Sequence, residues 1–171
     1  MKVEDGTGLA DADSYVTLDY ADNYFYSRGN AEWEDIDYEE KERLLVVATD
    51  YIDSVFVWKG KRKSRTQSLR FPRVNVYDYE GEEIEGIPNA LMQSVCDIAM
   101  SAHGGTELFG VSEKGGDVIS ENIGGMLSFT YAQKTKESKY VSVFESVNAR
   151  LRGMYVEVSE RTAMSGKTER G

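Results

Sequence analysis

The chain contains one cysteine, Cys96, and one histidine, His103, and these two residues limit the nucleophilic and metal chemistry open to it. Seven residues along a predicted helix separate them by about 10 Å, which is too far for the hydrogen bond of a Cys–His dyad. A zinc site needs three or four such ligands, and a disulfide within the chain needs a second cysteine. We therefore expect no catalytic residue, no metal and no cofactor, with Cys96 in the core and His103 at a helix end.

Carboxylates and glycine pairs are the other groups that could bind an ion or a phosphate. Acidic clusters occur at residues 32–37 and 80–85, but neither has the Asp/Asn spacing, central glycine and terminal glutamate of a calcium loop. The glycine pairs at 104–105, 115–116 and 124–125 belong to no GxGxxG or phosphate-loop motif. We interpret the clusters as solvated acidic surface, and we expect the protein not to be an enzyme.

A short basic segment interrupts the acidic character of the chain. The net charge is −10, yet residues 59–73 carry seven basic and no acidic residues, whereas residues 1–58 carry fifteen acidic and four basic ones. Such a net charge disfavours general binding to duplex nucleic acid, which depends on neutralising phosphates. A compact basic segment in an acidic chain predicts a specific docking surface. Its interface or nucleic-acid candidates are Lys59, Lys61, Arg62, Lys63, Arg65, Gln67, Arg70, Phe71 and Arg73.

Two hypotheses explain this basic segment from its residues. Basic side chains interleaved with aromatic ones, here Trp58 and Phe71, are the elements of single-stranded nucleic-acid binding. Alternatively, the segment is a solvated loop that pairs with the acidic N-terminal half of a neighbouring copy. Composition leaves both hypotheses open.

Hydrophobic periodicity predicts the helices that would hold this loop in place. Apolar residues recur at helical spacing in four segments, and a brief turn around Trp33 lies between the first two. Thr17 has the type and position of an N-cap, Asp37 and Glu40 have the spacing of a capping box, and Pro88 stands where the first helical residue belongs. The predicted helices span residues 18–28, 38–55, 88–102 and 140–152, with the second at the centre of the core.

The segments outside these helices are predicted to be extended or irregular. The apolar period changes to two around Gly124 and Gly125, which predicts a β-hairpin at about 117–131. The predicted fold class is mainly α: a helical bundle of about four helices with a β-hairpin and extended terminal arms, with a minor α+β character. Its predicted parts are an N-terminal arm at 1–13, a helical domain with the hairpin at 14–152, and a C-terminal tail at 153–171 that buries little.

No run of about 20 apolar residues is present, and the N-terminus lacks the apolar region of a secretory signal. We therefore expect no membrane partner. With a single cysteine, the chain is also predicted to fold in a reducing compartment.

Several segments, in the same order along the chain, resemble a family of small proteins of tailed bacteriophages and prophages. The most specific is residues 67–73, which read Gln-Ser-Leu-Arg-Phe-Pro-Arg. The resemblance covers about residues 10–150. Its other segments are residues 11–18, 28–33, 48–52, 58–60, 87–88 and 119–131.

Members of this family are labelled in two ways: as head-tail connector proteins (also adaptor or head-completion proteins), and as proteins with a DnaT-like single-stranded-DNA-binding domain. The connector label implies a ring of this chain, expected to hold twelve copies, in the neck of the virion. Such a ring would contact the portal protein and a tail or second neck protein, and channel DNA would pass through it without specific binding. The protein would be assembled into the virion in the host cytoplasm.

The DnaT-like label implies instead that loop 59–73 binds single-stranded DNA. Three features favour the connector hypothesis: the polar C-terminal tail, the acidic net charge that suits a wall along which DNA slides, and the separation of an acidic half from a basic loop. The DnaT-like function is the alternative.

Overall fold

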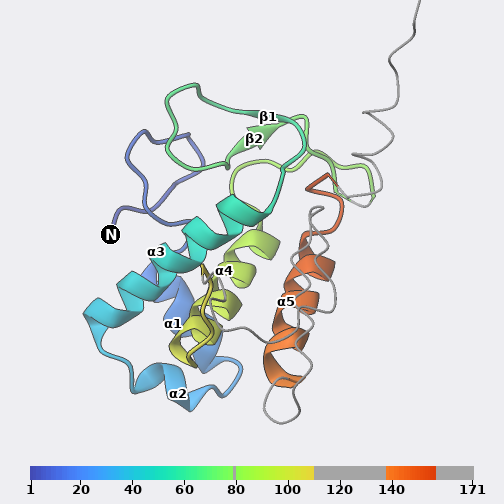
Figure 1. Ribbon diagram of the computed structural model, residues 1–171. Helices are drawn as coiled ribbons and strands as arrows, with labels where there is room; N and C mark the ends of the chain where they lie inside the picture. Colours follow the sequence, from blue (N-terminus) through green and yellow to red (C-terminus); the bar gives the residue numbers. More distant parts are fainter. Residues whose placement is uncertain (79, 110–137, 157–171) are drawn as a thin grey trace, which may run out of the picture.

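A computed structural model of the chain describes residues 1–78, 80–109 and 138–156 (Figure 1). Within these residues the protein has five α-helices and one small antiparallel sheet of two strands, which confirms the mainly α fold with a minor β component. The hairpin predicted at 117–131 lies outside the described residues. The elements are α1 (Leu18–Tyr26), α2 (Ala31–Glu34), α3 (Tyr38–Val55), β1 (Lys61–Arg62), β2 (Arg73–Val74), α4 (Asn89–His103) and α5 (Ser138–Leu151).

The ends of the four predicted helices fall within two residues of the observed ends, although two of the predicted caps act differently. Thr17 caps α1 as predicted, because its side chain accepts a hydrogen bond from the backbone N–H of Tyr20 at 3.1 Å. Asp37 stands at the N-cap position of α3, but its side chain makes no capping hydrogen bond. Pro88 is the N-cap of α4 and not its first residue, so the helix begins at Asn89.

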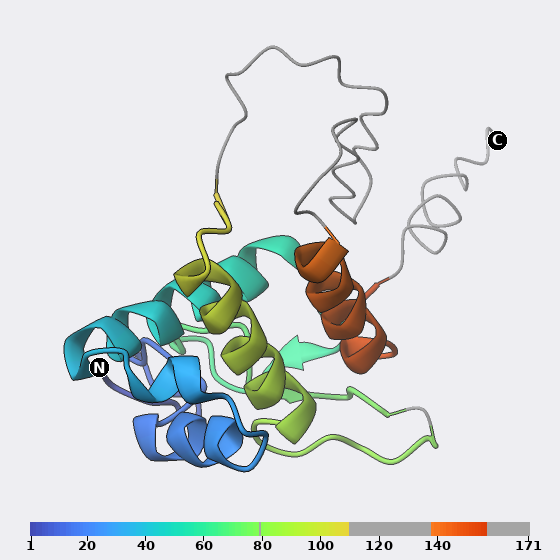
Figure 2. The ribbon, with the colours of Figure 1, turned by 90° about the horizontal axis from the view of Figure 1, so that it is seen from below.

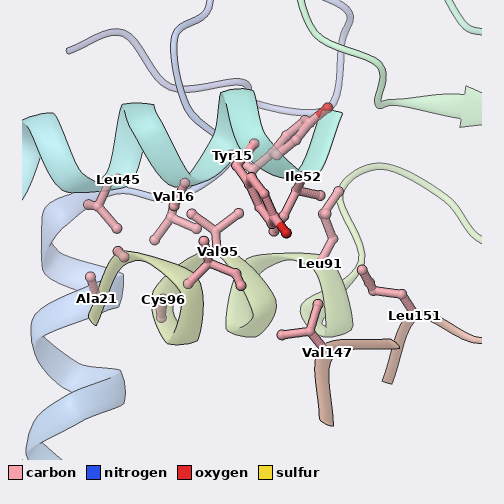
Figure 3. Close-up of a cluster of buried hydrophobic side chains, with 14 of the residues drawn as sticks. Tyr15, Val16, Ala21, Leu45, Ile52, Leu91, Val95, Cys96, Val147 and Leu151 are labelled. Atoms are coloured by element: carbon pink, nitrogen blue, oxygen red, sulfur yellow. The ribbon is translucent and has the colours of Figure 1, made fainter. Parts of the chain in front are cut away.

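The core lies between α3 and α4, with α5 on the other side of α4 and α1 against it (Figure 2). Figure 3 shows its apolar centre, where Leu45 and Ile52 of α3 face Leu91 and Val95 of α4, all of them buried. The first pair is seven residues apart and the second is four residues apart, which places each pair on one face of its helix. The centre of the core therefore contains α3, as the sequence predicted, together with α4.

The chain does not leave the core where α5 ends. Residues 154–156 run antiparallel to residues 57–59, and two backbone hydrogen bonds of 2.8 and 2.9 Å join the two segments. Tyr155 is buried, and its ring packs against Phe56 with 4.8 Å between the ring centroids. The predicted tail of 153–171 therefore begins too early, and its remainder lies outside the described residues.

Candidate interaction site: the basic loop

The basic loop, residues 59–73, leaves the end of α3 and returns through a short antiparallel ladder at the top of Figure 1. Its two strands, which the sequence did not predict, pair Lys61 with Val74 and Arg62 with Arg73. Gly60 has a φ of 69°, and a Cβ atom there would collide with the backbone oxygen of Val74. Only glycine fits this position, so the two sides of the loop lie in close contact at its base.

Gln67 supports the loop from within. Its side chain is 2% exposed, and its Nε2 donates hydrogen bonds to the backbone oxygens of Leu69 and Pro72, at 2.9 and 3.1 Å. Its Oε1 accepts a hydrogen bond from the backbone N–H of Ser64 at 2.8 Å. Three backbone groups of the loop are thus satisfied by one amide side chain, and Gln67 is not available to a partner.

Arg73 has a similar internal role. Its guanidinium donates hydrogen bonds to the backbone oxygens of three loop residues, Lys59 at 2.6 Å, Gly60 at 2.9 Å and Arg70 at 3.1 Å, and of Trp58 just before the loop at 3.4 Å. Burial lowers the pKa of Arg73, and the nearby charges of Arg62 and Arg70 lower it further. Arg73 therefore holds the base of the loop together and is the least accessible of its arginines.

The two aromatic residues predicted as stacking partners for bases are both in the core. Phe71 is fully buried and Trp58 is 6% exposed, and their rings meet edge to face with 4.9 Å between centroids. A base stacks on an aromatic ring only where a ring face is open to solvent. Neither ring offers such a face, so the basic loop lacks the stacking platform that its sequence indicated.

A buried hydroxyl and carboxylate connect the loop to α3. The hydroxyl of Tyr15 donates to the carboxylate of Asp53, at 2.8 and 2.9 Å, and accepts from the backbone N–H of Phe71 at 2.9 Å. Asp53 also accepts from the backbone N–H of Arg70 at 2.8 Å. Burial raises the pKa of Asp53, and the hydrogen bonds from Arg70 and Tyr15 offset this only in part. Burial also raises the pKa of Tyr15.

The N-terminal arm packs against the other side of the loop. The buried Glu4 carboxylate accepts hydrogen bonds of 2.8–3.0 Å from three backbone N–H groups of the arm, at residues 6, 8 and 9. In the arm so folded, the backbone oxygen of Gly6 accepts from Lys63 Nζ at 2.8 Å. Ser68 donates its backbone N–H to Leu9 and its hydroxyl to Ala12, at 2.9 and 2.7 Å. The arm and the loop therefore form one unit.

Four cations remain on the outer side of the loop. Lys61, Arg62, Arg65 and Arg70 are exposed, and no ion pair joins them to another residue in the described ranges. Arg62 also stands directly opposite Arg73 in the ladder, an arrangement of like charges that costs stability. The loop thus presents a positive surface whose four cations form no ion pair within the described part of the chain.

A family model described as "Putative DnaT-like ssDNA binding protein" matches residues 1–171. The chain belongs to this DnaT-like family. No significant match was found among curated proteins or among solved structures. The family description corresponds to one of the two labels that the sequence resemblance implied, and the connector label has no counterpart in it.

In this member of the DnaT-like family, all nine predicted site residues lie in one loop, but they do not share one role. Gln67, Phe71 and Arg73 face inward, Lys63 contacts the arm, and Lys59 is partly buried at the base. Tyr15 and Asp53, which position the loop, were not among the residues predicted from the sequence. A signal was present for Asp53, which lies four residues after Thr49 and eight after Leu45 and so shares their buried face of α3.

Within residues 1–78, 80–109 and 138–156, no group of three His, Cys, Asp or Glu side chains is placed to hold a metal ion. No helix in that part of the chain is long and apolar enough to cross a bilayer.

Proposed function

We propose that this chain is an assembly protein that forms a ring between the portal and the tail of a tailed bacteriophage and so extends the DNA channel. In this proposal the outer side of the basic loop binds protein neighbours. The observation that carries it is the contrast within the loop: its aromatic rings and Gln67 are buried, while Lys61, Arg62, Arg65 and Arg70 are exposed without an ion pair to another described residue.

The geometry favours a protein partner for this surface. Binding of single strands combines a positive groove with exposed aromatic rings, and the loop has only the first of these. Carboxylates on a neighbouring protein match guanidinium groups in charge and in the geometry of paired hydrogen bonds. A preformed loop also loses little conformational freedom when it binds, because Gln67 and Arg73 already fix its backbone.

Charge supports the position of the chain around a DNA channel. A net charge of −10 repels phosphates once the basic loops are covered by protein contacts, so DNA would pass without adhering. The ring and its place in the neck follow from the resemblance to the connector proteins, whose Gln-x-Leu-x-Phe-Pro-Arg element is the segment that closes this loop. The partners proposed are further copies of the chain, the portal protein and a tail or second neck protein.

The test is assembly on the portal protein encoded by the same phage or prophage. Full-length protein is mixed with purified portal rings and imaged by negative stain. We expect an added ring of density on one face of the portal, and we expect Arg62→Glu with Arg65→Glu to abolish it. As a control, Glu80→Lys with Glu82→Lys reverses two exposed charges outside the loop, in the opposite sense, and should leave the ring in place. Absence of the added ring with wild-type protein would refute the proposal.

Single-stranded DNA binding is the second candidate function, because the family description names it. The four outer cations could neutralise phosphates without any stacking. Under this alternative, a labelled oligonucleotide would bind the wild-type protein at moderate salt and would not bind the Arg62→Glu, Arg65→Glu variant. Assays on the wild type and on this variant therefore distinguish ring assembly from single-stranded DNA binding.

A further inference from the structure

A second charged surface lies at the far end of the molecule from the basic loop. The acidic turn, residues 32–39, joins α2 to the first turn of α3 and contains no basic residue. Its carboxylates form no ion pair with another residue that the structure describes. All five are exposed: Glu32, Glu34, Asp35, Asp37 and Glu39.

Buried contacts of Trp33 hold the backbone of the acidic turn in place. Trp33 is 1% exposed, stacks on Phe25 with 4.5 Å between ring centroids, and donates its Nε1–H to Asp22 at 2.7 Å. Lys41 of α3 already pairs with Asp22 at 3.2 Å and lies 5.4 Å from the centroid of the Trp33 ring. Trp33 therefore anchors the backbone that carries the carboxylates, and Lys41 is already paired.

The acidic turn also contains an exposed aromatic residue, next to Asp37 and Glu39 in sequence. Tyr38 is 63% exposed, and its hydroxyl donates to Glu42 at 3.3 Å, so the ring is directed along the surface of α3. A guanidinium binds well where it can stack on an aromatic face and also reach carboxylates. The acidic turn offers both features together, and the outer side of the basic loop offers arginines.

The chain cannot neutralise the acidic turn with its own N-terminal cations. Residues 1–58 contain four basic residues, and each is engaged elsewhere. The basic loop lies at the opposite end of the molecule from α2 (Figure 1), so it cannot reach the acidic turn of its own chain. The four engagements are Lys2 with Asp11, Lys41 with Asp22, Arg43 with Glu40, and Arg28 over the ring of Tyr24.

We infer that the basic loop of one copy binds the acidic turn of a second copy. This inference rests on the proposed assembly function and names the surface that the loop meets there. Because the two surfaces differ and lie at opposite ends, each copy can bind one neighbour through its loop and another through its turn. Such head-to-tail contacts generate a ring where the rotation between copies closes.

The test uses two charge-reversed full-length variants and their mixture. The loop variant carries Arg62→Glu and Arg65→Glu, and the turn variant carries Glu34→Lys and Asp35→Lys. Association is measured by sedimentation velocity at about 0.1 M salt, where the screening length is about 10 Å, and by negative stain on portal rings. The control, Glu80→Lys with Glu82→Lys, changes the net charge as the turn variant does but at a different surface.

Each variant alone should associate with itself at least about tenfold more weakly than the wild type, because the loop and the turn then carry like charge. An equimolar mixture should restore association, since the reversed loop of one variant matches the reversed turn of the other. The mixture has the same mean net charge as the wild type, so recovery cannot come from net charge. The control should associate at least as well as the wild type.

The inference is overturned if the wild type associates and the mixture does not, because the loop then binds some other surface. It is also overturned if the wild type shows no contact between copies in either assay. Failure of the proposed function gives a different result: the wild type and the mixture associate in solution, but no ring forms on the portal.

Discussion

The inner and outer sides of the basic loop contain the same residue types in very different surroundings. Arg73 and Arg62 face each other across the ladder, yet Arg73 donates hydrogen bonds to four backbone oxygens, whereas Arg62 is exposed and has no ion pair with a described residue. Gln67 is likewise buried between two exposed neighbours, Thr66 and Ser68. Residue type alone therefore does not decide which side chain meets a partner. The bonds that close the loop decide it.

The inner and outer sides of the loop should also contribute differently to stability and to binding. The inner side should carry most of the folding free energy of the loop, because its groups are buried and satisfied. The outer side should carry most of the binding free energy, because its charges have no partner in the described part of the chain. Mutations on the two sides should therefore give opposite patterns of effect.

The largest effect on stability is expected at Phe71. Phe71→Ala removes a fully buried ring that packs on Trp58, and we expect a loss of about 3–5 kcal/mol in the free energy of unfolding. Urea titration monitored by tryptophan fluorescence would measure it. Tyr26→Ala, at a residue that is 76% exposed, is the control and should change stability by less than about 0.5 kcal/mol. Near-equal values for the two variants would show that Phe71 is not part of the core.

A smaller but clear effect is expected at Gln67. Gln67→Ala removes the hydrogen bonds to the backbone N–H of Ser64 and the backbone oxygen of Leu69, while the oxygen of Pro72 keeps the one from the N–H of Lys63, and this loss should cost about 2–3 kcal/mol. Amide hydrogen exchange should show faster exchange at Ser64 in the variant. Unchanged stability and exchange would mean that water replaces the amide without loss and that Gln67 does not hold the loop.

The raised pKa of Asp53 predicts that its contribution to stability decreases as the pH rises. Its folded-state pKa is raised by burial, so the folded protein binds the Asp53 proton more tightly than the unfolded chain does. The contribution of Asp53 to stability is therefore fully present below its ordinary pKa of about 3.9 and is lost as the pH rises through the raised value. The stability of Asp53→Asn relative to the wild type should rise from pH 4 to pH 7. If the stability of Asp53→Asn relative to the wild type fell between pH 4 and pH 7, the pKa of Asp53 would be lowered in the fold and not raised.

The smallest effect on stability is expected on the outer side. Arg65→Ala should change the free energy of unfolding by less than about 0.5 kcal/mol, because the side chain is exposed and has no ion pair in the described ranges. It should nonetheless weaken ring formation on the portal, as measured by negative stain. A large loss of stability would place Arg65 with the inner residues and remove the contrast between the two sides.

The sequence predicted the parts of this molecule that depend on local pattern. Helical periodicity and Thr17 located the helices, and charge located the loop. Gln67 could not be assigned to the interior, because its partners are backbone groups brought together only when the loop closes. Under the single-strand hypothesis Trp58 and Phe71 were candidate stacking residues because they lie beside cations. Their burial depends on contacts that form only in the fold: Trp58 packs on Phe71, thirteen residues later, and Phe56 beside it packs on Tyr155.

The burial of residues 154–156 was missed for a related reason. The segment is too short to show a period, and it is packed by residues 57–59, which are about a hundred positions away in sequence. Pairing over such a separation leaves no local pattern. Asp53 is different, since its place on the buried face of α3 was visible in the spacing.

The central claim is that the outer side of the basic loop binds protein and not DNA. Fluorescence anisotropy of a labelled single-stranded oligothymidine, titrated with wild-type protein at about 150 mM salt, tests it most directly. We predict no saturable binding and no difference between the wild type and Arg62→Glu with Arg65→Glu. Tight binding that is lost in this variant, and that weakens with salt at a slope of about −0.7 per phosphate neutralised, would contradict the account and support the DNA-binding function.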